Sequence, residues 1–128
     1  LLEEVKKYEL VFLDPDNGLE VKSVKMGGKN SEKYIYLCEL EEIWKNNKSF
    51  LFFQHFPRIN RDEFIVDLTL KISKLCFNSA VLTFRAANIV LVLALQPLHQ
   101  KYKGEIILEI KEKWKDEFTI MDDKKNLF

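Results

Sequence analysis

The sequence predicts an α/β fold in which helices cover both faces of a mostly parallel β-sheet with one antiparallel strand. Three observations support this. Short apolar runs alternate with amphipathic segments long enough to be helices, the first run shows no polar alternation, and the last two runs are only three residues apart. An apolar run without alternation is typical of a strand buried on both faces of a sheet. We therefore predict three layers, with elements in the order β-α-β-α-β-β-α.

The first half of the chain contains two predicted strands and one helix. Residues 10–13 form the first strand, and residues 14–33 form a long polar loop with a short strand around 19–24. Apolar residues at helical spacing predict a helix over residues 34–47. Residues 49–56 are almost entirely apolar and form the second buried strand, which the following proline ends.

The second half contains two helices and two strands. Charges between regularly spaced apolar residues predict an amphipathic helix over 61–75. The runs at 80–84 and 88–95 lie too close together for a crossover helix, so they should pair antiparallel, whereas the three strands at 10–13, 49–53 and 80–84 should be mutually parallel. A last helix covers 102–118, and the residues from Thr119 on are expected to be a solvated tail.

A length of 128 residues indicates one domain over residues 1–128, and the element order makes it an α/β domain. Hydrophobic residues make up 47% of the chain, which excludes a disordered one, and we expect Phe12, Phe52, Val81 and Leu93 in the core. Twenty acidic residues balance twenty basic ones, so any basic contact surface must be local. No apolar run is long enough to span a bilayer, so no membrane is expected as a partner. The chain lacks an initiating methionine, and we interpret it as the carboxyl-terminal portion of a longer protein.

The two cysteines, Cys38 and Cys76, lie far apart in apolar contexts. We interpret both as reduced, buried residues of a cytoplasmic protein, because disulfides are rare in reducing compartments. No signal peptide is visible.

Polar residues follow the first strand directly, in the order Asp14, Pro15, Asp16, Asn17 and Gly18. In open α/β sheets, ligands bind beyond the carboxyl ends of the strands, so this segment is the candidate site.

Gln54 and His55 end the neighbouring strand and should point to opposite faces, so only one of them joins Asp14. His55 near a carboxylate is a candidate general base; alternatively, it caps the strand by hydrogen bonding. Asp14 is expected to lie within reach of this strand end, and Asp16 and Asn17 are expected to be accessible at the mouth of a concave surface.

Basic side chains around this strand end can bind phosphate. Arg58 and Arg61 follow the second strand, Lys29 lies in the long loop, and Arg85 lies in the hairpin connection. The alternative is that these residues belong to ordinary solvated surface.

The acidic segment also permits a metal site. Asp14, Asp16, Asn17 and Glu20 offer the oxygen ligands that Mg²⁺ takes. The alternative is turn chemistry, since proline presets φ and asparagine and glycine accept positive φ. A nuclease pattern, Pro-Asp…Glu-X-Lys, is present, but its gap of three residues is too short for two strands of a hairpin. We predict no metal ligands.

The element order and the segment from Asp14 to Asn17 resemble the carboxyl-terminal half of a class I S-adenosylmethionine-dependent methyltransferase, a Rossmann-like fold. In that family a strand ending in Asp/Asn-Pro-Pro-aromatic leads to a helix, another strand and helix, and a closing antiparallel hairpin. Asp14 and Pro15 match the first two motif positions, whereas Asp16 replaces the second proline and Asn17 the aromatic. The resemblance implies that Asp14 and the Pro15 carbonyl hold a target amino nitrogen.

The resemblance implies S-adenosylmethionine as cofactor only if a glycine-rich half precedes this chain. Such cofactors lie on a glycine-rich strand-to-helix turn, which the four glycines here do not form. The whole pattern, with Gln54-His55-Phe56-Pro57-Arg58, is also similar to that of uncharacterised bacterial and phage proteins.

The sequence therefore predicts a methyltransferase-like enzyme acting on nucleic acid or a nucleotide. The alternatives are a non-catalytic module that binds a partner through the 14–33 loop, and a Mg²⁺-dependent nuclease. The predicted catalytic residues are Asp14, Pro15, Asp16, Asn17 and His55, and the predicted substrate-binding residues are Gln54, Arg58, Lys29 and Arg85.

Overall fold

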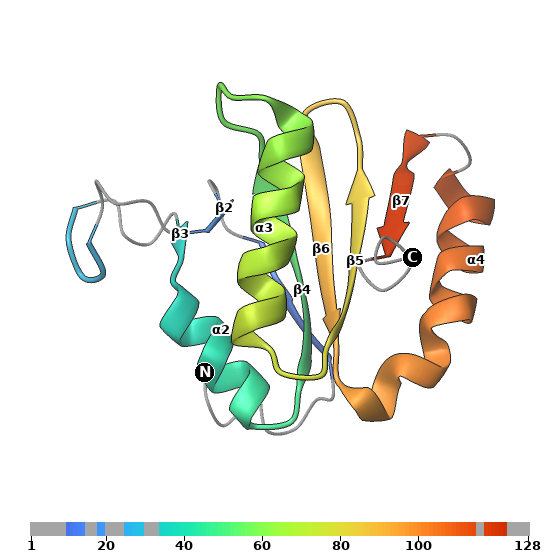
Figure 1. The fold of residues 1–128 in the computed structure, drawn as a ribbon, viewed down its shortest axis with the longest axis horizontal. Coiled ribbons are helices and arrows are strands. Elements are labelled where there is room, and N and C mark those ends of the chain that lie inside the picture. The colour runs from blue at the N-terminus through green and yellow to red at the C-terminus, as the bar shows by residue number, and fades with distance from the viewer. Residues whose placement is uncertain (1–9, 15–17, 20–24, 30–33, 115–116, 123–128) are drawn as a thin grey trace.

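A computed structural model of the chain describes residues 10–14, 18–19, 25–29, 34–114 and 117–122. Their main feature is a five-stranded sheet with the strand order β1-β4-β6-β5-β7 (Figure 1). A second, two-stranded sheet pairs β2 with β3 in parallel. The strands are β1 (Leu10–Leu13), β2 (Gly18–Leu19), β3 (Tyr34–Ile35), β4 (Ser49–His55), β5 (Ala80–Arg85), β6 (Ile89–Leu95) and β7 (Thr119–Asp122).

The α-helices of the described residues are α2 (Leu37–Lys45), α3 (Arg61–Leu75) and α4 (Lys103–Trp114), and the 3₁₀-helix η2 (Pro97–Tyr102) leads into α4. The bounds of α3 confirm the predicted helix. Its first turn is capped by Asn60, whose side chain accepts a hydrogen bond from the Glu63 N–H at 3.0 Å.

The prediction of a mostly parallel sheet is wrong. In the five-stranded sheet only β1 and β4 pair in parallel, whereas β4–β6, β6–β5 and β5–β7 are antiparallel. The predicted β5–β6 hairpin is confirmed. Its second strand, however, lies between β4 and β5, so each of these two strands has an antiparallel neighbour. The fold is α/β with a mixed, mostly antiparallel sheet.

Strand direction still follows the prediction. β4 and β5 both run antiparallel to β6, so β1, β4 and β5 point the same way. In Figure 1, α3 lies in front of the sheet and β5 lies to the right of β4, which is the right-handed sense of a crossover. These three strands therefore end at one edge, after Leu13, His55 and Arg85. We call it the carboxyl edge.

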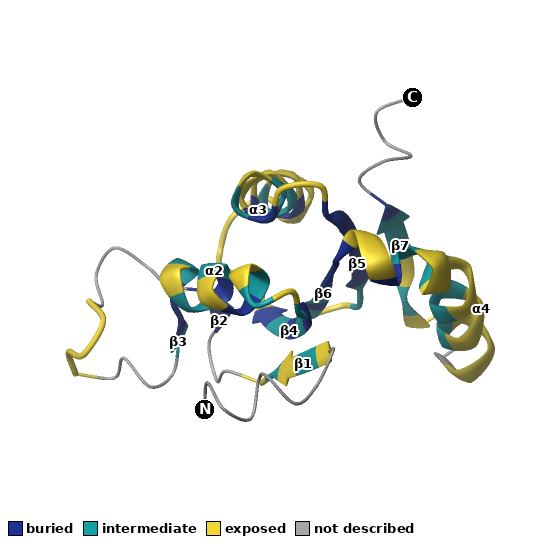
Figure 2. Cartoon of the chain, turned by 90° about the horizontal axis from the view of Figure 1, so that it is seen from below, coloured by how far each residue is buried: buried dark blue, intermediate teal, exposed yellow. Residues whose placement is uncertain are grey.

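Both faces of the sheet bury apolar side chains (Figure 2). On one face, α2 and α3 pack against β4, β5 and β6, with Phe50, Phe52 and Ile72 fully buried. On the other face, α4 covers β5 and β6, where Leu82 and Phe84 meet Ile106. Because successive strand residues point to opposite faces, a strand covered by helices on both sides must be apolar throughout, as β6 is.

Three expectations for the core are confirmed: Phe52, Val81 and Leu93 are buried. Phe12 is 53% exposed, contrary to the prediction. It lies on edge strand β1 and faces away from α2 and α3. Its ring makes an edge-to-face contact with Phe53 of the neighbouring strand, with centroids 5.5 Å apart.

The chain after α4 was predicted to be a solvated tail, but residues 119–122 form β7 at the far edge of the sheet. A buried ion pair holds this strand. The Asp122 carboxylate lies 2.7 Å from the Lys103 Nζ at the start of α4, and the Asp122 side chain is only 3% exposed. A strand of four residues leaves too weak a pattern to be recognised from sequence.

The two cysteines have different environments. Cys76 is buried, as predicted, whereas Cys38 is exposed on α2, contrary to the prediction. Both are free thiols. Burial raises the pKa of the Cys76 thiol to about 12, so it stays protonated near neutral pH.

We expect this difference to appear in thiol reactivity, because the thiolate is the nucleophile. At about pH 8, a disulfide reagent such as DTNB should modify one thiol per folded chain rapidly and two in denaturant. The Cys38→Ser variant should lose the rapid phase, and the Cys76→Ser variant should keep it. Rapid modification of both thiols in the folded protein would contradict the buried position of Cys76.

Candidate functional site

The carboxyl edge brings together the ends of β1 and β4, as the parallel pairing of these strands requires. Asp14 follows β1 and is exposed, and His55 ends β4 and is also exposed. Among the described residues, no hydrogen bond or ion pair joins Asp14 to Gln54 or His55. Pro15, Asp16 and Asn17 lie outside the described residues. The expected accessibility of Asp16 and Asn17 therefore stays a prediction.

Gln54 binds the backbone at Leu19, which follows the segment from Asp14 to Gly18. Its side chain points to the face covered by α2 and α3 and is buried, whereas the next residue, His55, is exposed. The Gln54 Oε1 accepts a hydrogen bond from the Leu19 N–H at 2.7 Å, and Nε2 donates to the His55 carbonyl at 2.9 Å. The prediction that these two side chains point to opposite faces of the sheet is therefore confirmed, with Gln54 pointing inward and His55 outward.

Gly18 makes this contact possible. Its φ of +104° lies in a region that other residues rarely adopt, and a Cβ at this position would collide with the Gln54 amide. The glycine of the Asp-Pro-Asp-Asn-Gly segment is thus explained by close packing on β4. The segment leaves β1 at Leu13, and the chain meets β4 again where Gly18 and Leu19 contact Gln54.

Beside His55, an aromatic ring is enclosed by two arginines. The guanidinium carbon of Arg61 lies 4.9 Å from the centroid of the Phe56 ring, and that of Arg85 lies 5.6 Å from it. Phe64 packs edge-to-face on the same ring at 5.9 Å. Arg85 also forms an ion pair with Asp62. We call Phe56, Arg61 and Arg85 the arginine–phenylalanine cluster.

This cluster depends on tertiary structure. Phe56 follows β4, Arg61 begins α3, and Arg85 ends β5, and all three positions lie at the carboxyl edge. Sequence reasoning identified both arginines as candidate phosphate ligands but missed the phenylalanine. An aromatic residue directly after a strand and before Pro57, where the chain leaves the sheet, was the available signal. Arg58 follows Pro57 directly, is exposed, and adds a third arginine to this part of the chain.

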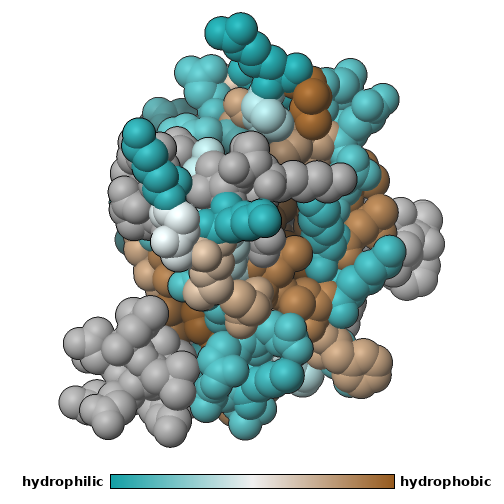
Figure 3. Space-filling model, turned by 90° about the vertical axis from the view of Figure 1, so that its left-hand side faces the viewer, coloured by the Kyte–Doolittle hydropathy of each residue, from teal (hydrophilic) through white to brown (hydrophobic). Residues whose placement is uncertain are grey.

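Lys29 does not join these arginines. It lies exposed in a turn over residues 25–29, which Figure 1 shows at the far left, beyond β2 and β3, whereas α3 begins and β5 ends near the top. The surface on the turn's side is mixed, with hydrophilic residues between hydrophobic areas (Figure 3). The basic residues proposed as one phosphate site therefore form two separate groups.

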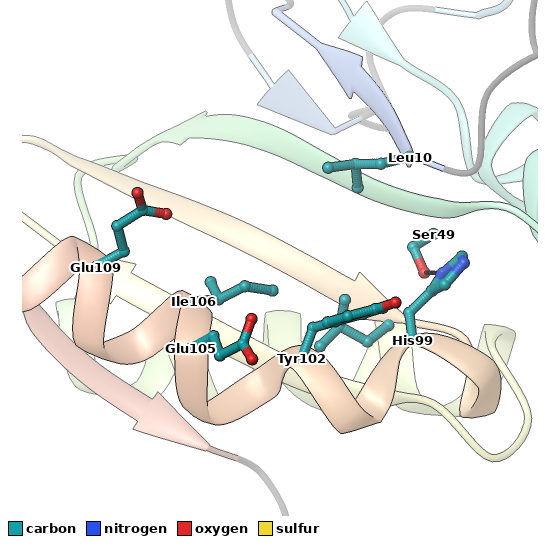
Figure 4. A pocket seen from close by; sticks show the side chains of 8 residues that line it. Leu10, Ser49, His99, Tyr102, Glu105, Ile106 and Glu109 are labelled. Atoms are coloured by element: carbon teal, nitrogen blue, oxygen red, sulfur yellow. Dashed lines mark hydrogen bonds between the residues drawn. The ribbon is translucent and has the colours of Figure 1, made fainter.

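A cavity of about 330 Å³ lies near the opposite end of β4, between the sheet and α4 (Figure 4). It holds a serine–histidine pair that sequence reasoning missed. The Ser49 Oγ is 2.6 Å from the His99 Nδ1 and accepts a hydrogen bond from the Gln96 N–H at 2.8 Å. The cavity is lined by Leu10, Ser49, Leu95, His99, Tyr102, Glu105, Ile106 and Glu109.

The geometry of this pair resembles that of a nucleophile and its base, but its burial favours a structural role. Ser49 is only 1% exposed, so its Oγ does not meet a substrate at the surface. The bonds to Gln96 and His99 instead join the start of β4 to the end of β6 and to η2.

Comparison of the chain with protein-family models, with curated proteins and with solved structures gave no match. In the described part of the chain, no helix is long and apolar enough to cross a membrane. No three acidic, histidine or cysteine side chains in that part lie close enough together to hold a metal ion.

Proposed function

We propose that this domain binds a nucleotide or a nucleic acid at the carboxyl edge, as the substrate-binding part of a methyltransferase-like protein. The observation that carries the proposal is the arginine–phenylalanine cluster, which lies at the same edge as Asp14 and His55. Guanidinium groups form paired hydrogen bonds with phosphate oxygens, and they stack on planar rings. Arg58 and Arg61 are exposed and supply this chemistry. At the same edge, the exposed side chains of Asp14 and His55 can accept a proton or a hydrogen bond.

The order of elements supports the methyltransferase-like part of the proposal. Apart from the short strands β2 and β3, the chain runs from β1 through α2 and β4 to α3 and then to the β5–β6 hairpin. This is the succession of strand, helix, strand, helix and closing hairpin that the resemblance implies. Asp14 stands at the end of the first of these strands, where a residue of that family holds the target amino group. The two free cysteines support a cytoplasmic location.

The glycines of this chain do not fit an S-adenosylmethionine site. Gly18 packs on Gln54, Gly27 and Gly28 lie in the turn over residues 25–29, and Gly104 lies within α4. None of them makes a glycine-rich turn from a strand into a helix, the arrangement that such a cofactor needs. The proposal is therefore limited to substrate binding by this chain.

Binding of a fluorescently labelled single-stranded oligonucleotide, followed by anisotropy at low salt, tests the proposal. We expect the Arg58→Ala/Arg61→Ala variant to bind at least about tenfold more weakly, since phosphate contacts dominate affinity for nucleic acids. The matched control is Lys113→Ala, which removes an exposed positive charge from α4 and should leave binding unchanged. Absence of binding by the unmodified protein to oligonucleotides and free nucleotides would refute the proposal.

The Asp14→Asn variant tests whether the Asp14 carboxylate contacts the ligand or only stabilises the turn. If Asp14 contacts the ligand, this variant should lose binding while its thermal unfolding stays unchanged, because the side chain is exposed. If the carboxylate serves only the turn, binding should persist and stability should fall by about 1 kcal/mol, the usual scale for a lost side-chain hydrogen bond.

A further inference from the structure

The outer surface of α3 carries apolar side chains with no described element against them. The helix packs on the sheet through Ile65 and Ile72, which are 1% and 0% exposed. Its opposite side presents Val66 and Leu70, each 51% exposed, and Phe77 just beyond the helix end is 79% exposed. Figure 1 shows this side of α3 facing the viewer and Figure 2 shows it uppermost, with open space beyond it in both views. We call Val66, Leu70 and Phe77 the α3 stripe.

The spacing of the stripe suits a second helix. Within the helix, Val66, Leu70 and Ser73 are separated by four and three residues, which is the spacing of the contact positions in two-helix coiled coils, and exposed Phe77 follows just beyond the helix end. Ser73, between the apolar residues, has a small side chain that allows close approach of a neighbouring backbone. An exposed apolar seam of this spacing is most fully buried by another helix that has the same spacing.

The charges beside the stripe identify that helix. Asp67 follows Val66, and Lys74 follows Ser73, so both flank the same side of the seam, seven residues apart. Neither side chain forms an ion pair with another described residue. In an antiparallel pair of identical helices, Asp67 of each copy faces Lys74 of the other. A parallel pair would bring each of these residues to the same level as its own copy, which gives no such compensation.

We propose that the protein forms a two-fold symmetric dimer through its α3 stripes, with the two helices antiparallel and joined at their flanks by two Asp67–Lys74 ion pairs. A two-fold interface uses the same patch on both copies, so one self-complementary helix is sufficient. The helix has 15 residues, or about 22 Å at 1.5 Å per residue. A contact of this length buries less than the roughly 1,200 Å² of a standard interface, so the dimer is weak and reversible. It forms independently of ligand binding at the carboxyl edge.

Sedimentation equilibrium of the purified chain from about 10 to about 500 µM tests the dimer. The unmodified protein should pass from monomer to dimer in this range. Asp67→Lys and Lys74→Asp should each raise the dimer dissociation constant at least about tenfold, because each places like charges opposite one another. The double variant Asp67→Lys/Lys74→Asp restores opposite charges and should associate to within about threefold of the unmodified protein.

Two further variants complete the test. Leu70→Lys should abolish association without lowering the thermal unfolding temperature of the monomer, since Leu70 is half exposed. Glu109→Lys reverses an exposed charge on α4 and should leave association unchanged. A protein that is monomeric throughout the range would overturn the proposal. So would a charge exchange that fails to restore association lost in the single variants.

Discussion

Replacing Phe52 by alanine should lower the free energy of unfolding by about 3–5 kcal/mol, as for other large core truncations. Phe52 is fully buried in β4 and stacks on Phe50, with ring centroids 6.1 Å apart. It is paired on one side with Leu13 of β1 and on the other with Val92 of β6. Loss of the ring leaves a cavity at the centre of the sheet that helix packing cannot fill. Urea denaturation followed by circular dichroism measures the effect.

Phe77 supplies the matched control, because it is the same residue type at 79% exposure. At low micromolar concentration, Phe77→Ala should change stability by no more than about 0.5 kcal/mol. If the two variants were equally destabilised, β4 would not be the buried strand that the structure describes.

Replacing Lys103 by methionine should lower the free energy of unfolding by about 3–5 kcal/mol, because the buried Asp122 carboxylate loses the Lys103 ammonium group. The Asp122 side chain is 3% exposed and the Lys103 side chain 28% exposed. Methionine keeps the length and packing of the lysine stem, so the loss reports the charge. Adding Asp122→Leu should recover most of this loss, since the buried carboxylate is then removed.

An exposed ion pair on the same helix gives the comparison. Lys113 and Glu109 are 70% and 67% exposed, with 3.4 Å between Nζ and Oε1. Lys113→Met should therefore change stability by less than about 1 kcal/mol. Equal losses for Lys103→Met and Lys113→Met in urea denaturation would show that β7 is not held by a buried pair.

Local patterns in the sequence were sufficient to place most elements. The helix over residues 61–75 has a capping asparagine and regularly spaced apolar residues, and the strands around Phe52, Val81 and Leu93 are apolar runs bounded by polar residues. The order of strands in the sheet depends on contacts between distant segments, which local patterns do not contain. One signal was available: the uninterrupted apolar run from Ile89 to Leu95 is typical of a central strand, buried on both faces.

The candidate site was predictable only in part. Parallel pairing of β1 and β4 brings Asp14 and His55 to one edge, and strand alternation separates Gln54 from His55, both of which follow from the sequence. The arginine–phenylalanine cluster required the position of β5, two strands away from β4. Lys29 lies in the chain between β2 and β3, and the pairing of these two short strands depends on contacts that local patterns do not contain.

The hydrogen bond from Leu19 to Gln54 affects the entropy of ligand binding. A flexible connection loses conformational freedom when a ligand orders it, and that loss weakens the complex. Here the described residues on either side of the Asp14 segment are fixed when the domain folds, because Leu13 pairs in β1 and Gly18 and Leu19 pack on Gln54. A ligand that contacts Asp14 therefore retains more of its interaction free energy as affinity. Under the proposed function, part of the strength of binding at this edge would thus be set by a glutamine that need not touch the ligand.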